Sequence, residues 1–133
     1  MRVLVIGDCH GEMPEIPETE YDAVLAVGDI CSGTDEMRNY MFEAIDNDKN
    51  WYELMGEESA KKEVEASIEE GHEILERLNS LGVPVYVVPG KWDWTFKDGG
   101  WEFLEGKGYP EMLSDYSNIQ DLNFKVETLN GVD

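Results

Sequence analysis

The sequence is poor in positive charge, in histidine and in cysteine, and it contains no long apolar run. Only 10 Lys and Arg oppose 30 Asp and Glu, which gives a formal net charge of −20 over 133 residues. Such a surface repels the phosphates of nucleic acids and of anionic membranes, so we expect neither as a partner. No apolar stretch approaches the roughly 20 residues that a membrane-spanning helix needs.

The two cysteines, Cys9 and Cys31, do not form a Cys-x-x-Cys pair and are too few for the disulfide framework of a small secreted protein. We therefore expect reduced thiols and a cytoplasmic location. The N-terminal stretch "MRVLVIGDCHG" passes directly from apolar to polar residues without a small-residue cleavage site, which is typical of a buried strand rather than a signal peptide. The acidic excess is explained by solubility, as in a salty cytoplasm.

Three continuous apolar runs predict strands at 2–6, 22–28 and 83–88. Runs of this kind, without alternation, are typical of a parallel sheet that is covered on both faces. The charged segment between the second and third runs predicts helices, and the order of elements predicts one α/β layered domain over residues 1–133.

Two helices are predicted in that charged segment. Residues 34–45 begin with Thr34, which can cap a helix with an acidic first turn. In residues 59–82, Ser59 can cap the helix and Gly82 can stop it. The apolar stripe of this second helix consists of Val64, Ile68, Leu75 and Leu78.

The C-terminal third has a different pattern. The Gly-rich residues 98–113 predict irregular structure with a short turn of helix, whereas residues 122–133 alternate between apolar and polar side chains. Asn130-Gly131 predicts a hairpin turn. A returning strand of about five residues does not follow it, so we expect a domain truncated before its C-terminal strands, as in a fragment or a split protein. The alternative is a frayed tail that forms no hairpin.

Polar loops follow the first two predicted strands. In "GDCHG", Asp8 and His10 are two positions apart, so in an extended segment both side chains point the same way and Cys9 points elsewhere. A carboxylate beside an imidazole makes a mixed oxygen and nitrogen site suited to Mn, Fe or Zn. Gly7 and Gly11 allow the backbone to turn tightly beside them.

The second loop, "VGDIC", places Asp29 at the corresponding strand end. Because the carboxyl ends of parallel strands meet at one edge of a sheet, we expect Asp29 to lie near Asp8 and His10. A carboxylate there can bridge two cations about 3.5–4 Å apart. The third loop, "PGKWDW", holds Lys91, Trp92 and Asp93.

In this order, Asp-x-His-Gly, Gly-Asp and Pro-Gly-x-x-Asp resemble the calcineurin-like metallophosphoesterase family, and above all its small archaeal and bacterial phosphoesterases. The resemblance covers nearly the whole chain but only the N-terminal half of the family's motif set. The family's Gly-Asn-His-Asp is altered here to Gly90-Lys91-Trp92-Asp93, whereas the later lone His and Gly-His-x-His have no counterpart. The only other histidine, His72, is predicted to be an exposed residue of the long helix. The resemblance implies a layered α/β sheet with flanking helices.

The resemblance also implies roles for individual residues. Asp8 and His10 would hold a first metal, and Asp29 would bridge it to a second. Lys91 stands where the family has a metal-binding Asn, and a protonated lysine offers no acceptor atom. Trp92 replaces the family's His that assists the leaving group, and Asp93 is retained where the family orients that His.

One divalent metal site for Mn, Fe, Zn or Mg is therefore expected and the second is not. Asp93 and Lys91 are the candidate catalytic residues, and Lys91 and Trp92 are the candidate substrate-binding residues. An ammonium group at Lys91 can offset the charge of Asp29 and contact a phosphate oxygen.

Two functions remain open. The first is a metal-dependent phosphoesterase that hydrolyses a phosphate mono- or diester with a metal-activated water and is completed by a C-terminal partner or extension that supplies the later histidines. A C-terminal complementing chain or a homo-oligomer is the expected protein partner. The second is a non-catalytic, phosphoesterase-like module that binds a partner or ligand. The aromatic residues near the third loop can form a surface beside the site or pack in the core: Trp92, Trp94, Phe96, Trp101 and Phe103. A dinucleotide-binding domain is disfavoured because no Gly-x-Gly-x-x-Gly follows the first strand.

Overall fold

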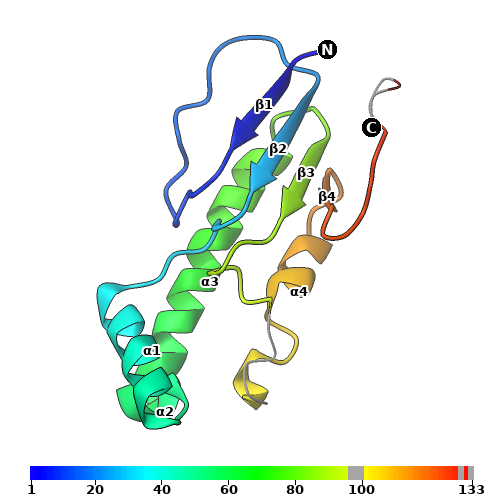
Figure 1. Cartoon of the computed structure of the whole chain (residues 1–133). Helices are drawn as coiled ribbons and strands as arrows, with labels where there is room; N and C mark the ends of the chain where they lie inside the picture. Colours follow the sequence, from blue (N-terminus) through cyan, green and yellow to red (C-terminus); the bar gives the residue numbers. More distant parts are fainter. Residues whose placement is uncertain (96–100, 129–130, 132–133) are drawn as a thin grey trace.

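The structure is a computed structural model that describes residues 1–95, 101–128 and 131. Four parallel strands form one sheet in the order β1 (Val3–Ile6), β2 (Ala23–Val27), β3 (Val85–Val88) and β4 (Ile119–Asp121). The carboxyl ends of these strands point toward the same edge of the sheet (Figure 1). The chain is therefore mixed α/β with a parallel sheet, and the three predicted strands are confirmed with slightly shorter bounds.

The helices follow β2 and β3. They are α1 (Asp35–Asn47), α2 (Trp51–Met55), α3 (Glu57–Asn79) and α4 (Tyr109–Ser114), and a 3-10 turn, η2 (Glu102–Leu104), precedes α4. The predicted cap of α1 is confirmed, because the Thr34 hydroxyl accepts the Met37 N–H at 3.2 Å. Among the described residues, no helix is long and apolar enough to cross a membrane.

The predicted start of α3 at Ser59 is wrong. The helix begins at Glu57, and its N-cap is Gly56. The φ of 92° at Gly56 separates α2 from α3. Ser59 therefore lies inside the first turn. At the other end, Ser80 caps the helix and Gly82, with φ of 76°, turns the chain toward β3.

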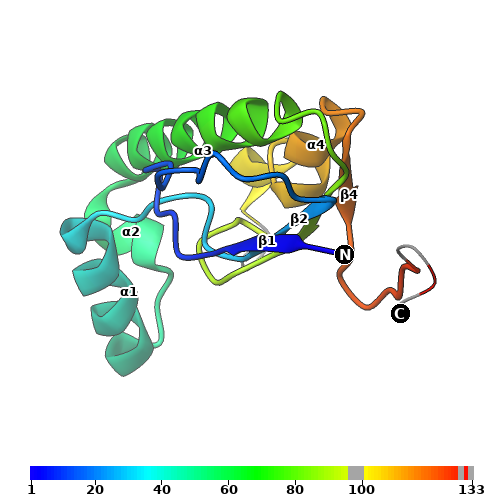
Figure 2. The same cartoon turned by 90° about the horizontal axis from the view of Figure 1, so that it is seen from above.

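The long helix α3 and the short helix α4 lie on one side of the sheet (Figure 2). Strand residues that face them, such as Val24, Val85 and Ile119, are buried. A Cβ atom at Gly71 would lie 2.5 Å from the Cys31 sulfur, so the glycine allows α3 to approach the loop after β2. Close packing at Gly71 thus holds the loop after β2 against the helix.

The opposite face is open around β1 and β2. Val3, Val5 and Val27 are 42%, 57% and 44% exposed. The expectation of a sheet covered on both faces is therefore wrong for these strands within the described residues. In these strands, side chains point alternately to the covered face and to the open face. The sequence does not show this alternation, because both faces carry aliphatic side chains.

The aromatic residues near the third loop pack in the core rather than forming a surface. The side chains of Trp92, Trp94 and Trp101 are each 7% exposed. The ring of Trp101 stacks on Tyr52 with centroids 4.3 Å apart, and it also contacts Phe103. Phe96 lies outside the described residues. The alternative of an aromatic surface is therefore wrong for the three tryptophans.

The C-terminal part differs most from the prediction. The short strand β4 at Ile119–Asp121 precedes the alternating segment, and residues 122–128 form no strand. Phe124 and Val126 are 101% and 80% exposed, so their alternation does not reflect one buried face. The predicted turn at Asn130-Gly131 depends on Asn130, which lies outside the described residues.

Candidate metal centre

Three loops meet at the carboxyl edge of the sheet, and backbone hydrogen bonds hold the first two together. The N–H groups of Asp8, His10 and Gly11 donate to the carbonyls of Gly28, Asp29 and Ile30 at 3.2, 2.8 and 2.9 Å. The two loops therefore run side by side beyond the ends of β1 and β2. This pairing continues the β1–β2 ladder and sets the separation of the side chains.

The third loop is joined to the second by Asp93. One carboxylate oxygen accepts the N–H groups of Ile30 and Cys31 at 2.8 and 2.9 Å, and the other accepts the N–H of Gly90 at 2.7 Å. Asp93 is 1% exposed. Burial raises its pKa, whereas the three backbone N–H groups act in the opposite direction.

Two glycines permit this approach. Gly28 has φ of 81°, and a Cβ atom there would lie 2.8 Å from the Gly90 Cα. At Gly90, a Cβ atom would collide with the backbone N of Asp29. A side chain at either position would push the second and third loops apart and would displace Asp29.

Asp8, His10 and Asp29 converge as the sequence predicts. One possible ligand atom from each residue lies within 4.8 Å of the others. His10 Nε2 is 4.0 Å from Asp29 Oδ2, whereas Asp29 Oδ1 accepts the N–H of Trp92 at 2.9 Å. Asp29 therefore has one oxygen fixed by the third loop and the other directed at the imidazole. Among the described residues, this triad is the one group found that could hold a metal ion.

All three residues have left-handed backbone conformations, with φ of 52°, 44° and 50° for Asp8, His10 and Asp29. This region costs an L-residue about 1–2 kcal/mol. Residues held in such conformations cluster at functional sites, where the surrounding structure over-determines them. Here the paired loops and the Asp93 bonds supply that constraint.

The donor set fits one divalent cation. Two carboxylates and an imidazole suit Mn, Fe or Zn, and ligand bonds of about 2.0–2.2 Å place two donors at most about 4.4 Å apart. The 4.0 Å separation of His10 and Asp29 lies inside that limit and is too long for a hydrogen bond. The ligand atoms of the full triad lie within 4.8 Å, slightly beyond that limit, so the exposed Asp8 side chain would move closer on binding a cation. The Nδ1 atom of His10 is buried and has no hydrogen-bond partner among the described residues.

The other candidate residues do not join the triad. Lys91 forms no ion pair with Asp29, contrary to the expectation that it sits beside that carboxylate. Its Nζ lies 5.8 Å from the ring centroid of Phe42 and 5.7 Å from that of Trp92. The Trp92 ring packs under Gly33, so its contribution to the site is the backbone N–H. The Asp93 carboxylate accepts backbone N–H groups of both loops and acts as a positioning residue.

The remaining histidine and both thiols also lie outside the triad. His72 is half-buried rather than exposed, and its Nδ1 is 2.8 Å from the Tyr116 hydroxyl. Burial raises the pKa of the Cys9 and Cys31 thiols, and the charge of Asp93 adds to that shift. Protonated thiols are poor ligands, so neither cysteine competes with the oxygen and nitrogen donors.

Sequence reasoning missed what the backbone does here. The N–H groups of Gly90 and Ile30 bind the Asp93 carboxylate, and that of Trp92 binds Asp29. No pattern of side chains in the sequence predicts these backbone contacts. It also missed Arg38 and Phe42 of α1, which lie against the third loop. Their spacing of four residues places them on one helix face, but only the folded chain brings that face to Trp92.

Comparison of the chain with models of known protein families, with curated proteins and with solved structures gave no match.

Proposed function

We propose that the chain binds one divalent cation through Asp8, His10 and Asp29 and hydrolyses a phosphate mono- or diester. The observation that carries the proposal is the convergence of these three donors, within 4.8 Å, at the carboxyl edge of a parallel sheet. Ligands of α/β sheets bind at this edge. The arrangement supports a metallophosphoesterase-like layering of the sheet, with Mn, Fe, Zn or Mg as the cation.

A bound cation supplies Lewis acidity and lowers the pKa of a water molecule. The chain supplies the rest. Asp8 and Asp29 provide the negative charge that holds a cation. The Trp92 N–H donates to one Asp29 oxygen and so fixes the orientation of the carboxylate. Lys91 provides positive charge at the rim for a phosphate oxygen. A complementing C-terminal chain would supply the family's later histidines.

The second candidate function is a phosphoesterase-like module that binds its ligand without cleaving it. Lys91 favours it, because the side chain at this position offers no acceptor atom to a second cation. Its ammonium has no lone pair, and both oxygens of Asp93 are committed to backbone N–H groups. Phosphoryl transfer depends on positive charge around the phosphate, so the loss of one cation lowers catalysis more than binding.

Metal binding is tested by thermal unfolding with Mn²⁺ or Zn²⁺ in excess. A ligand at about 100 times its Kd stabilises the folded state by about 2.7 kcal/mol, so we expect a clear rise in Tm. Asp8→Asn should remove this rise. Glu12→Gln is the matched control, because it removes one negative charge from the same exposed loop outside the triad. Equal Tm shifts in both variants would contradict the site.

Hydrolysis of bis(4-nitrophenyl) phosphate then separates the two functions. The enzyme predicts metal-dependent release of nitrophenol that Asp8→Asn abolishes, and an increase when Lys91→Asn restores an acceptor. The binding module predicts no turnover in either the parent chain or the Lys91→Asn variant, and a Tm that does not depend on metal favours it. A chain that neither binds metal nor releases nitrophenol would overturn the enzyme.

A further inference from the structure

A cavity lies between α1 and the third loop, next to the candidate metal centre. It has a volume of about 230 Å³ and is lined by Arg38, Met41, Phe42, Ile45, Lys91 and Trp92. Two cations and no carboxylate line it, in a chain of net charge −20. By contrast, a groove of about 380 Å³ beside α3 and α4 is lined by four carboxylates: Glu65, Glu69, Glu111 and Asp115.

Both cations of the cavity lie against the same aromatic ring. The Arg38 Cζ is 5.6 Å and the Lys91 Nζ is 5.7 Å from the ring centroid of Trp92. Both cations therefore border one cavity, and each would attract an anion bound there. Arg38 uses one nitrogen to bind Asp35 at 3.2 Å and retains further N–H donors.

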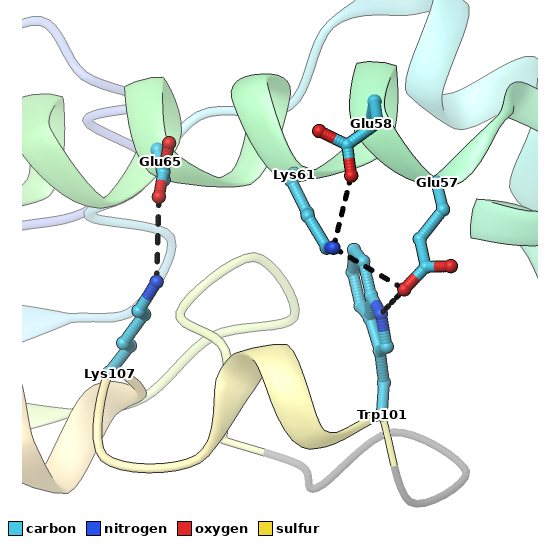
Figure 3. Close-up of polar contacts among 6 residues, drawn as sticks. All are labelled: Glu57, Glu58, Lys61, Glu65, Trp101 and Lys107. Atoms are coloured by element: carbon cyan, nitrogen blue, oxygen red, sulfur yellow. Dashed lines mark hydrogen bonds and ion pairs between the residues drawn. The ribbon is translucent and has the colours of Figure 1, made fainter.

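Lys91 has no carboxylate partner among the described residues, and the same holds for Lys49 and Lys62, whereas Lys61, Lys107 and Lys125 are paired. Lys61 binds Glu57 and Glu58, and Lys107 binds Glu65 (Figure 3). Thirty carboxylates are present, yet none of those described neutralises Lys91. Its ammonium is therefore available to an external anion.

The other wall of the cavity is apolar and exposed. Phe42 is 63% and Ile45 is 77% exposed, and both lie on the helix face that also carries Arg38. Burial of such side chains by a ligand contributes roughly 25 cal/mol per Å² of apolar surface. An engineered cavity of about 150 Å³ holds a benzene molecule, so 230 Å³ suits one ring with an anionic group.

We propose that this cavity binds a small organic anion with a single ring. Its phosphate or carboxylate lies between Arg38 and Lys91, and its ring packs on Phe42 and Ile45. Trp92 links the cavity to the metal centre, because its ring lines the cavity and its N–H holds Asp29. The substrate class that follows, a phosphate ester of a ring-bearing alcohol, rests on the proposed function; the anion site itself does not.

The test is NMR titration of the full chain in EDTA, following the indole N–H of Trp92, assigned with Trp92→Phe. Phenyl phosphate should cause saturable shifts. Lys91→Gln and Arg38→Gln should each weaken binding by about tenfold or more, as expected for a lost charge-assisted contact. Lys107→Gln is the matched control, because it removes the same charge from a lysine that also lies over an aromatic ring, at 3.8 Å from Phe103. It should leave the affinity within about twofold.

Three further ligands make the outcome decisive. Benzyl alcohol should bind at least about tenfold more weakly than phenyl phosphate, because it lacks the charge. Inorganic phosphate should also bind more weakly, because it lacks the ring. Benzoate distinguishes the anion: if it binds far more tightly than phenyl phosphate, the phosphate-ester assignment is overturned and the organic-anion site stands.

No saturable shift at Trp92, or equal affinity for benzyl alcohol and phenyl phosphate, would overturn the anion site. The result does not depend on the metal centre. Asp8→Asn should retain phenyl phosphate binding in EDTA while losing the metal-dependent rise in Tm. Binding without hydrolysis would therefore count against the enzyme alone, and hydrolysis without a preference for ring-bearing esters would count against this cavity alone.

Discussion

At the scale of single residues, Asp93 joins two loops that are more than 60 positions apart in the chain. Its carboxylate is buried and accepts three backbone N–H groups. Each buried donor left without a partner costs about 1–3 kcal/mol. We expect Asp93→Ala to lower the free energy of unfolding by roughly 3 kcal/mol or more, measured by urea denaturation.

Asp22→Ala is the matched control for this substitution. Asp22 also accepts a backbone N–H, that of Arg2 at 2.7 Å, but the bond is exposed. Water can replace it, so the cost should be about 1 kcal/mol or less. Asp93→Asn should fall between the two, because its amide N–H₂ group faces the Gly90 N–H. Equal costs for both alanine variants would show that Asp93 does not hold the loops together.

The three metal-binding candidates could be predicted from the sequence because Asp8 and His10 follow one strand and Asp29 follows the neighbouring parallel strand. The premise of an extended segment at Asp8 and His10 is wrong, because both residues have positive φ and the paired loops bring their side chains together. The role of Lys91 could not be predicted in this way. Its ammonium lies on Phe42, 49 positions earlier in the chain, and nothing local specifies that contact.

At the scale of elements, length decided what the sequence could predict. The 23-residue α3 and the 13-residue α1 repeat their apolar positions often enough for the helical period to be visible. The five-residue α2 and the three-residue β4 are too short to show a period. Residues 122–128 alternate like a strand, but a strand also needs a partner, and the alternating segment has none among the described residues.

The hydroxyl of Tyr109 ties α4 to the sheet. It lies 3.2 Å from the Val87 carbonyl and 3.2 Å from the Asp121 carboxylate, which belong to β3 and β4. Tyr109→Phe should cost about 1–2 kcal/mol at pH 7, because the burial remains but the hydroxyl contacts are lost. Urea denaturation measures this cost, with Tyr40→Phe in α1 as the control, because Tyr40 is also partly buried.

The same hydroxyl predicts a pH dependence. Burial raises the pKa of Tyr109 above its ordinary value of 10.0, and the charge of Asp121 adds to the shift. A group with a raised folded-state pKa stabilises the fold below its unfolded pKa, and this stability is lost as the pH rises toward the folded value. The parent chain should therefore lose stability above pH 10 more steeply than Tyr109→Phe. Parallel curves would contradict the shift.

At the scale of the whole molecule, positively charged side chains are scarce, and several of them form ion pairs with neighbouring carboxylates. Lys61, Lys107 and Arg38 form ion pairs at 3.2 to 3.5 Å on the surface, where each pair contributes about 0–1 kcal/mol. Such pairs leave the excess of 20 negative charges uncompensated. Repulsion among them acts over the distance that dissolved salt leaves unscreened, about 10 Å at 0.1 M.

Stability should therefore rise with ionic strength. Raising NaCl from about 0.02 to about 0.5 M shortens the screening distance several-fold, and a gain of about 1 kcal/mol raises Tm by roughly 2–8 °C. Tetramethylammonium chloride should act alike, since screening does not depend on cation identity. Glu69→Lys with Glu73→Lys, both exposed on α3, changes the net charge from −20 to −16 and should reduce the slope of Tm against salt. A Tm of the parent chain that does not change with salt would contradict this prediction, and would mean that local contacts offset the repulsion. A rise in Tm with NaCl but not with tetramethylammonium chloride would indicate specific Na⁺ binding rather than screening.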